Sequence, residues 1–268
     1  FGFDFIFFIA VILIERSIVG IIFIIFFRNF RSKINFNFFS NSLCQYYLSN
    51  CWKEVLNGIS IVLMLRFPLF YIGYFGSDKD KAIFGTALRV MDVFLTVMQA
   101  YSKVIMPTFF RKYSRNVAEA MIFFKKQLSI YLITIFLSIL ASIFLSSSLF
   151  IIFFGKDLSE SSNIFNILVF TPYIHSLAIM SGCLLIAKNK IIVNTIRSSL
   201  GLFVCITLTP ILINEFGLIG GSYTIIISTM VSFMLYSFFS KELRFISWIK
   251  TKAFFTAGLI YLRPHEKN

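Results

Sequence analysis

The chain has 268 residues, of which 58% are hydrophobic and 14% charged, and its formal net charge is +13. Soluble domains carry a charge on about a quarter of their residues, so this composition excludes an ordinary soluble globular domain. It predicts an all-α integral membrane protein, because an apolar segment of roughly 20 residues crosses the hydrocarbon core as a helix.

Seven apolar segments are long enough to span a membrane. The predicted transmembrane helices cover residues 5–27, 54–75, 82–106, 127–153, 163–186, 191–214 and 217–240. The fourth is longer than a perpendicular span requires, so it must tilt or end in the interface. A last apolar segment, 253–262, is too short to span, and we expect it to lie at the membrane surface.

Lysine and arginine residues are concentrated in the connections after the first, third, fifth and seventh predicted spans. The other connections carry only Lys79, Lys81 and Lys156, together with a larger number of carboxylates. Cytoplasmic loops hold an excess of basic residues, so the first set is predicted to be cytoplasmic and the chain to end inside. This sorting by topology argues against nucleic acid as a partner, which would require basic residues gathered on one face.

The third predicted span carries a continuous stripe of polar residues. Its members follow one another at steps of four, three, four, three and four, and they are Gly85, Arg89, Asp92, Thr96, Gln99 and Lys103. That spacing places them on one helix face. An ionised group at the bilayer midplane costs at least ~2.5 kcal/mol, so the stripe must face other helices or a watery cavity.

Arg66 lies near the middle of the second predicted span and has no carboxylate within helical reach. It must therefore meet Asp92, Glu15, another part of the protein or an anionic ligand, and a guanidinium suits phosphate oxygens. The spacing of Arg89 and Asp92 also allows a purely structural pair within one helix. Glu15 and Arg16 are adjacent in the first span, about 100° apart, so they cannot face the same direction.

Two further features are typical of helix packing. His175, central in the fifth span, has hydroxyl neighbours and is expected to be hydrogen-bonded within the bundle in preference to relaying protons. Pro172 beside it predicts a kink, because proline removes a backbone donor. Ser138, Ser142 and Ser146 recur every four residues in the fourth span, which favours close approach of neighbouring helices.

The sequence offers little for covalent chemistry. It contains no phosphate-binding glycine loop, nucleophile elbow or metal-binding spacing, and its four cysteines are expected to be ordinary small apolar residues. The predicted outer connections, 76–81, 155–162 and 214–215, are too short to hold an active-site domain. We therefore expect no enzyme activity, no cofactor and no bound metal.

Several segments resemble the polysaccharide and O-antigen flippases, the oligosaccharidyl-lipid branch of the MATE-like exporter superfamily. The similar pieces are Trp52, Arg66 and the segments 82–92, 103–107 and 216–224. Together they cover the second to seventh predicted spans. The resemblance implies two six-helix lobes around a central cavity that opens alternately to either side.

Carried over to this chain, the resemblance assigns 54–240 to a C-terminal six-helix lobe and 1–27 to the last helix of an incomplete N-terminal lobe. Residues 28–53 would be the cytoplasmic connection between the lobes, and 241–268 a cytoplasmic tail. The chain begins with Phe1 and enters a predicted span at once, without a basic leader. We therefore expect a C-terminal portion whose N-terminal lobe is missing.

The implied function is transport of an undecaprenyl-pyrophosphate-linked oligosaccharide, a repeat unit of O-antigen (lipopolysaccharide), capsule or exopolysaccharide, across the bacterial inner membrane. Lipid-linked oligosaccharide and membrane lipid would be the partners. The expected cavity residues are Arg66, Arg89, Asp92, Gln99, Lys103, Arg16 and Glu15. Many relatives place an acidic residue shortly after the arginine of the second span, whereas Phe67 and Pro68 stand here, which puts ion coupling through this helix in doubt.

Two alternatives stay open. A multidrug or cation antiporter of the same superfamily should have an acidic cavity, yet the midplane charges are three arginines against Glu15 and Asp92. A membrane-embedded polysaccharide polymerase would be favoured by a long outer loop with charged clusters, which the predicted topology does not contain.

Overall fold

The computed structural model describes residues 41–188 and 190–236, together with residues 14, 17, 18, 20–22 and 25. Contacts divide the chain into two units, Phe1–Cys51 and Trp52–Asn268. In the first unit the described residues are helical, including the first part of α2. The helices discussed below belong to the second unit.

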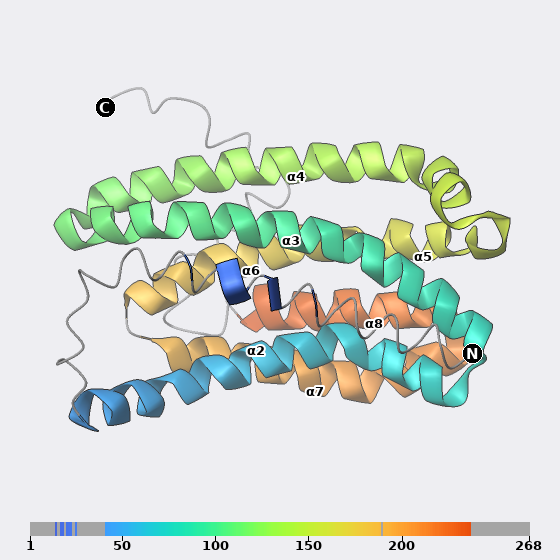
Figure 1. The fold of residues 1–268 in the computed structure, drawn as a ribbon, viewed down its shortest axis with the longest axis horizontal. Helices are drawn as coiled ribbons and strands as arrows, with labels where there is room; N and C mark the ends of the chain where they lie inside the picture. Colours follow the sequence, from blue (N-terminus) through green and yellow to red (C-terminus); the bar gives the residue numbers. More distant parts are fainter. Residues whose placement is uncertain are drawn as a thin grey trace. The chain divides into compact units, whose positions relative to one another are not determined.

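The described residues contain helices and turns but no β-strand. The long helices are antiparallel neighbours joined by short turns (Figure 1). In chain order the elements are α2 (Asn41–Phe75), α3 (Asp78–Arg115), α4 (Val117–Phe154), η3 (Lys156–Leu158), α5 (Ser161–Leu168), α6 (Phe170–Ala187), α7 (Ile191–Phe216), α8 (Leu218–Met230) and the π-helical turn η4 (Val231–Leu235).

Among the described residues, five helical segments are long and apolar enough to cross a membrane, which indicates a membrane protein. They are Cys51–Phe75, Asp78–Arg115, Val117–Phe154, Ser161–Ala187 and Ile191–Phe216. These five overlap the second to sixth predicted spans. The seventh prediction, 217–240, corresponds in the described part to the shorter apolar helix Leu218–Met234. The predicted first span 5–27 lies mostly outside the described residues, and 253–262 entirely so, so the seven-helix count stays a prediction.

Helices α3 and α4 extend well beyond the apolar segments that predicted them. Each has 38 residues, about 57 Å of helix, whereas the hydrocarbon core is about 30 Å thick. A capping box between Ser77 and Asp80 starts α3, and the Asn116 side chain accepts hydrogen bonds from the first backbone amides of α4. These capping residues are polar and lie outside the apolar segments. Hydropathy alone therefore predicts helices that are too short.

A one-residue interruption of the helix lies just before Pro172, but its backbone stays in the right-handed helical region, so the predicted kink stays a prediction. α5 ends at Leu168 and α6 begins at Phe170, with Val169 between them. Pro172 is the third residue of α6 and, because it has no amide hydrogen, it cannot donate to the carbonyl of Leu168.

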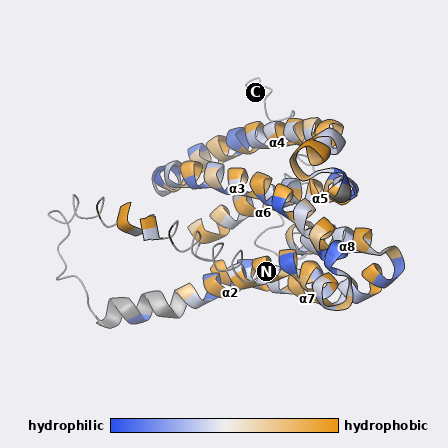
Figure 2. Cartoon of the chain, turned by 45° about the vertical axis from the view of Figure 1, so that its right-hand side comes forward, coloured by the Kyte–Doolittle hydropathy of each residue, from blue (hydrophilic) through white to orange (hydrophobic). Residues whose placement is uncertain are grey.

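Glycines bring α7 and α8 into close contact. Gly217 turns the chain between them with φ +59°, a conformation that favours glycine. A Cβ added at Gly220 would lie 1.9 Å from the carbonyl oxygen of Leu212, so the two backbones can approach only if this residue is glycine. Many large apolar side chains are exposed, for example Phe144 at 84%, as a lipid-facing surface requires. Hydrophobic residues recur along the labelled helices (Figure 2).

Candidate polar site on helix α3

The polar stripe lies on the face of α3 that the bundle leaves exposed. Arg89, Thr96, Gln99 and Lys103 are exposed, while Asp92 is half-buried. The opposite face packs into the core through residues that include Ile83, Phe84, Ala87, Leu88, Met91, Leu95 and Met98. Within the described chain, the membrane-length helix α3 therefore presents a row of polar groups that its own bundle does not cover.

Arg66 of α2 and Asp92 of α3 form an ion pair. Nη2 of Arg66 donates to Oδ2 of Asp92 at 2.5 Å, and the two side chains are 33% and 32% exposed. Of the partners that the sequence left open for Arg66, the structure selects Asp92. The possible pair between Arg89 and Asp92 within α3 is not formed, because the carboxylate turns to the neighbouring helix.

Arg89 and Lys103 have no ionic partner among the residues that the structure describes. Thr96 donates its hydroxyl to the backbone oxygen of Asp92, one turn earlier on the same helix. Together with Arg66 of α2, the exposed face thus presents three cations and one carboxylate, and that carboxylate is already paired with Arg66. Its net charge is positive, which suits an anionic ligand. Glu15 and Arg16, the other expected cavity residues, lie outside the described part of the chain.

Sequence reasoning missed a buried cation, Arg197 of α7. Only 3% of this residue is exposed. Its Nη1 donates to Ser181 Oγ at 2.8 Å and its Nη2 donates to the Ala178 carbonyl at 3.0 Å, both on α6. The guanidinium lies over the ring of Phe233, 5.2 Å from its centroid, and the same ring meets His175 edge-on at 5.1 Å. A charge inside the apolar segment 191–214 was the signal that could have found it.

Arg197 also has an electrostatic interaction with a carboxylate, that of Glu54 on α2. The two form no ion pair, since Oε2 of Glu54 accepts a hydrogen bond from Asn57 at 3.2 Å, and Oε1 has no hydrogen-bond partner in the described structure. Arg197 is therefore held by neutral groups that tie α7 to α6. His175 is buried beside this contact, as expected, but its Nδ1 has no hydrogen-bond partner among the described residues.

Replacing Arg197 by alanine is expected to destabilise the bundle without touching the exposed face. Hydrogen bonds to charged groups contribute about 1.5–3 kcal/mol each, so the Tm in detergent should fall by about 4 °C or more. Thermal unfolding followed by intrinsic fluorescence measures this. Arg89→Ala is the matched control, since that side chain is exposed and should leave the Tm nearly unchanged. An unchanged Tm for Arg197→Ala would contradict the structural role.

Comparison with known proteins finds one relevant likeness. No family model and no solved structure matches the chain. It is similar to a Staphylococcus aureus protein named "Capsular polysaccharide biosynthesis protein CapF", with 29% identity over 185 residues. The match covers 68% of this chain and 44% of the relative, so the chain spans less than half the length of that protein.

Proposed function

We propose that this chain is part of a flippase that moves an undecaprenyl-pyrophosphate-linked oligosaccharide across the bacterial inner membrane by alternating access. The observation that carries the proposal is the exposed cationic face of α3. Arg89 and Lys103 lie there without ionic partners among the described residues, on a helix otherwise suited to lipid. The name of the Staphylococcus aureus relative, a capsular polysaccharide biosynthesis protein, supports a substrate from the same area of metabolism.

The proposed mechanism contains no covalent step. Moving an ion from water into the hydrocarbon core costs several kcal/mol even after relaxation, and the pyrophosphate head carries more than one charge. The α3 face would replace the water around that head with fixed donors, Arg89 and Lys103, while Arg66 keeps donors beyond its contact with Asp92. The lipid tail would stay among apolar groups throughout.

The proposed cavity needs a second wall opposite α3, because the cationic face of α3 cannot be exposed to lipid. We propose that a separate N-terminal lobe supplies it, with 54–240 forming the C-terminal lobe, 28–53 the connection and 241–268 a cytoplasmic tail. Movement of one lobe against the other would open the shared cavity to either side in turn.

The alternative function, a cation antiporter of the same superfamily, is less well supported by the contact between Arg66 and Asp92. Such a transporter needs a carboxylate that can exchange its cation, and Asp92 is already held by Arg66 at 2.5 Å. Asp92 is the one carboxylate of the α3 stripe.

The proposal is tested by Arg89→Ala and Arg89→Lys in the assembled protein. Loss of a hydrogen bond to a charged group should reduce export of surface polysaccharide about tenfold or more, and lysine should restore it only in part, because it cannot bind phosphate through a planar fork. Surface polysaccharide per copy of transporter is the measurement. Arg111→Ala, an exposed arginine of α3 away from the stripe, is the control. Normal export by Arg89→Ala would contradict the proposal.

A further inference from the structure

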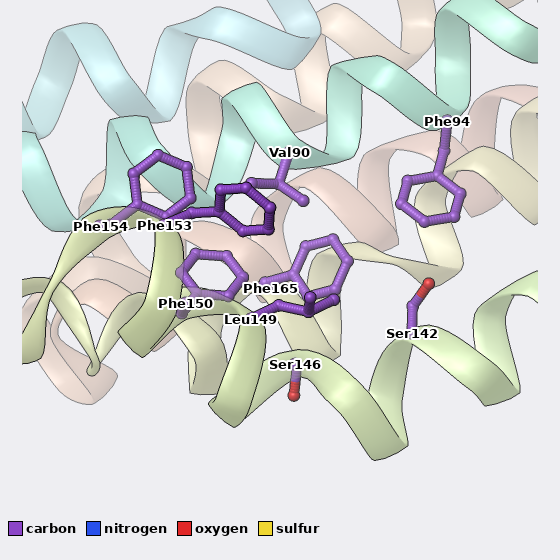
Figure 3. A pocket seen from close by; sticks show the side chains of 9 residues that line it. All are labelled: Val90, Phe94, Ser142, Ser146, Leu149, Phe150, Phe153, Phe154 and Phe165. Atoms are coloured by element: carbon purple, nitrogen blue, oxygen red, sulfur yellow. The ribbon is translucent and has the colours of Figure 1, made fainter.

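Two neighbouring apolar cavities form a groove between α3 and α4. Their volumes are about 320 Å³ and about 220 Å³, and both are bounded by Phe94 of α3. Figure 3 shows the larger one, with Phe94 directed across it toward Ser142 of α4. On α4 the lining extends from Tyr131 to Phe154, about 35 Å of helix. We name this feature the α3–α4 groove.

The chemistry of the groove suits hydrocarbon. Phenyl rings dominate the larger cavity, including Phe94, Phe150 and Phe165. The serine and threonine hydroxyls that line α4 are already used, since each donates to a carbonyl of its own helix at 2.7–3.0 Å, and they are those of Thr134, Ser138, Ser142 and Ser146. The hydroxyl of Tyr131, at one end of the lining, has no hydrogen-bond partner in the described structure. The serine stripe, expected from the sequence to bring helices together, here forms the floor of a groove.

The groove adjoins the cationic face on the same helix. Val93 and Val97 line its rim and are 61% and 65% exposed. Val93 follows Arg89 by four residues, so the two side chains are about 40° apart around the helix axis. A ligand with an anionic head and a hydrocarbon tail could therefore place its head beside Arg89 and its tail in the groove.

The length of the groove distinguishes between lipids. The hydrocarbon core is about 30 Å thick, so a phospholipid acyl chain has about 15 Å available in its own leaflet. The α3–α4 groove extends over about 35 Å of α4, which exceeds the thickness of both leaflets. Two apolar cavities that follow one another over this length fit a chain much longer than an acyl tail.

We infer that the α3–α4 groove binds the long polyisoprenoid chain of the transported lipid. This inference rests on the proposed function and deepens it, because it adds a tail site to a head site. The tail would hold the substrate against α3 while the head moves along the cationic face.

Binding is tested with a photoreactive residue placed in the assembled protein, reconstituted in phosphatidylcholine nanodiscs that contain undecaprenyl phosphate. Position 142 lies in the groove, and position 144, 84% exposed on the same helix and outside both cavities, is the control. Mass analysis should find the undecaprenyl phosphate adduct at position 142 in about tenfold excess over position 144. Equal adducts at both positions, or a protein adduct at position 142, would overturn the inference.

A second pair of variants links the groove to transport. Ser142→Trp should fill the groove and lower export about tenfold at normal abundance. Displacing a few methylene groups of the lipid tail from the groove would lose enough binding free energy for that reduction. Phe144→Trp should have no effect, because position 144 lies outside both cavities. Normal export by Ser142→Trp, with export lost in Arg89→Ala, would overturn the groove and leave the proposed function standing. A specific adduct at position 142 in a protein that transports no lipid-linked sugar would support the groove and overturn the proposed function.

Discussion

Replacing Arg66 by alanine is expected to reduce both the abundance of the protein and its transport. The change leaves Asp92 as an unpaired carboxylate on a membrane helix. The pair is about one-third exposed, so its loss should cost between the ~0.2–1 kcal/mol of an exposed pair and the ~3–5 kcal/mol of breaking a buried one. Abundance in the membrane and export of polysaccharide are measured separately.

The double variant Arg66→Ala with Asp92→Ala distinguishes structure from function. Removing both charges abolishes the unpaired carboxylate, so abundance should recover toward that of the unmodified protein. Export should stay low, because a guanidinium has been lost from the face that we propose binds the pyrophosphate. If export recovered together with abundance, the pair would only fasten α2 to α3, and Arg66 would have no part in the site.

A large loss of transport is also expected when this chain is expressed without a second lobe. Residues 1–268 expressed alone are expected to give no transport, because the cationic face of α3 would then meet lipid or another copy in place of a second lobe. A strain that lacks its own flippase should recover surface polysaccharide only when a separate N-terminal lobe is expressed with the chain. Recovery with the chain alone would show a complete transporter and would overturn the two-lobe proposal.

The sequence predicted the parts of the fold that depend on local pattern. Apolar length located the five membrane-length helices, and the spacing from Gly85 to Lys103 placed the stripe on one face of α3.

The sequence could not choose among partners that lie on different helices. Arg66 meets Asp92 only because α2 lies beside α3, and no spacing along the chain encodes that contact. The neutral contacts of Arg197 with Ser181 and the Ala178 carbonyl on α6 depend on tertiary packing in the same way. The α3–α4 groove was missed since its serines have the spacing of a packing interface, and only the neighbouring helix shows that space remains above them.

Transport in proteoliposomes tests the central claim most directly. The assembled protein would be reconstituted with a fluorescent undecaprenyl-pyrophosphate-linked sugar, and loss of protection from a membrane-impermeant quencher would report movement of the head. We expect translocation with the unmodified protein, about a tenfold or larger reduction with Arg89→Ala, and full activity with Arg111→Ala. Translocation by Arg89→Ala at the same rate as by the unmodified protein would contradict the account, and so would a rate for the unmodified protein no higher than that in protein-free vesicles.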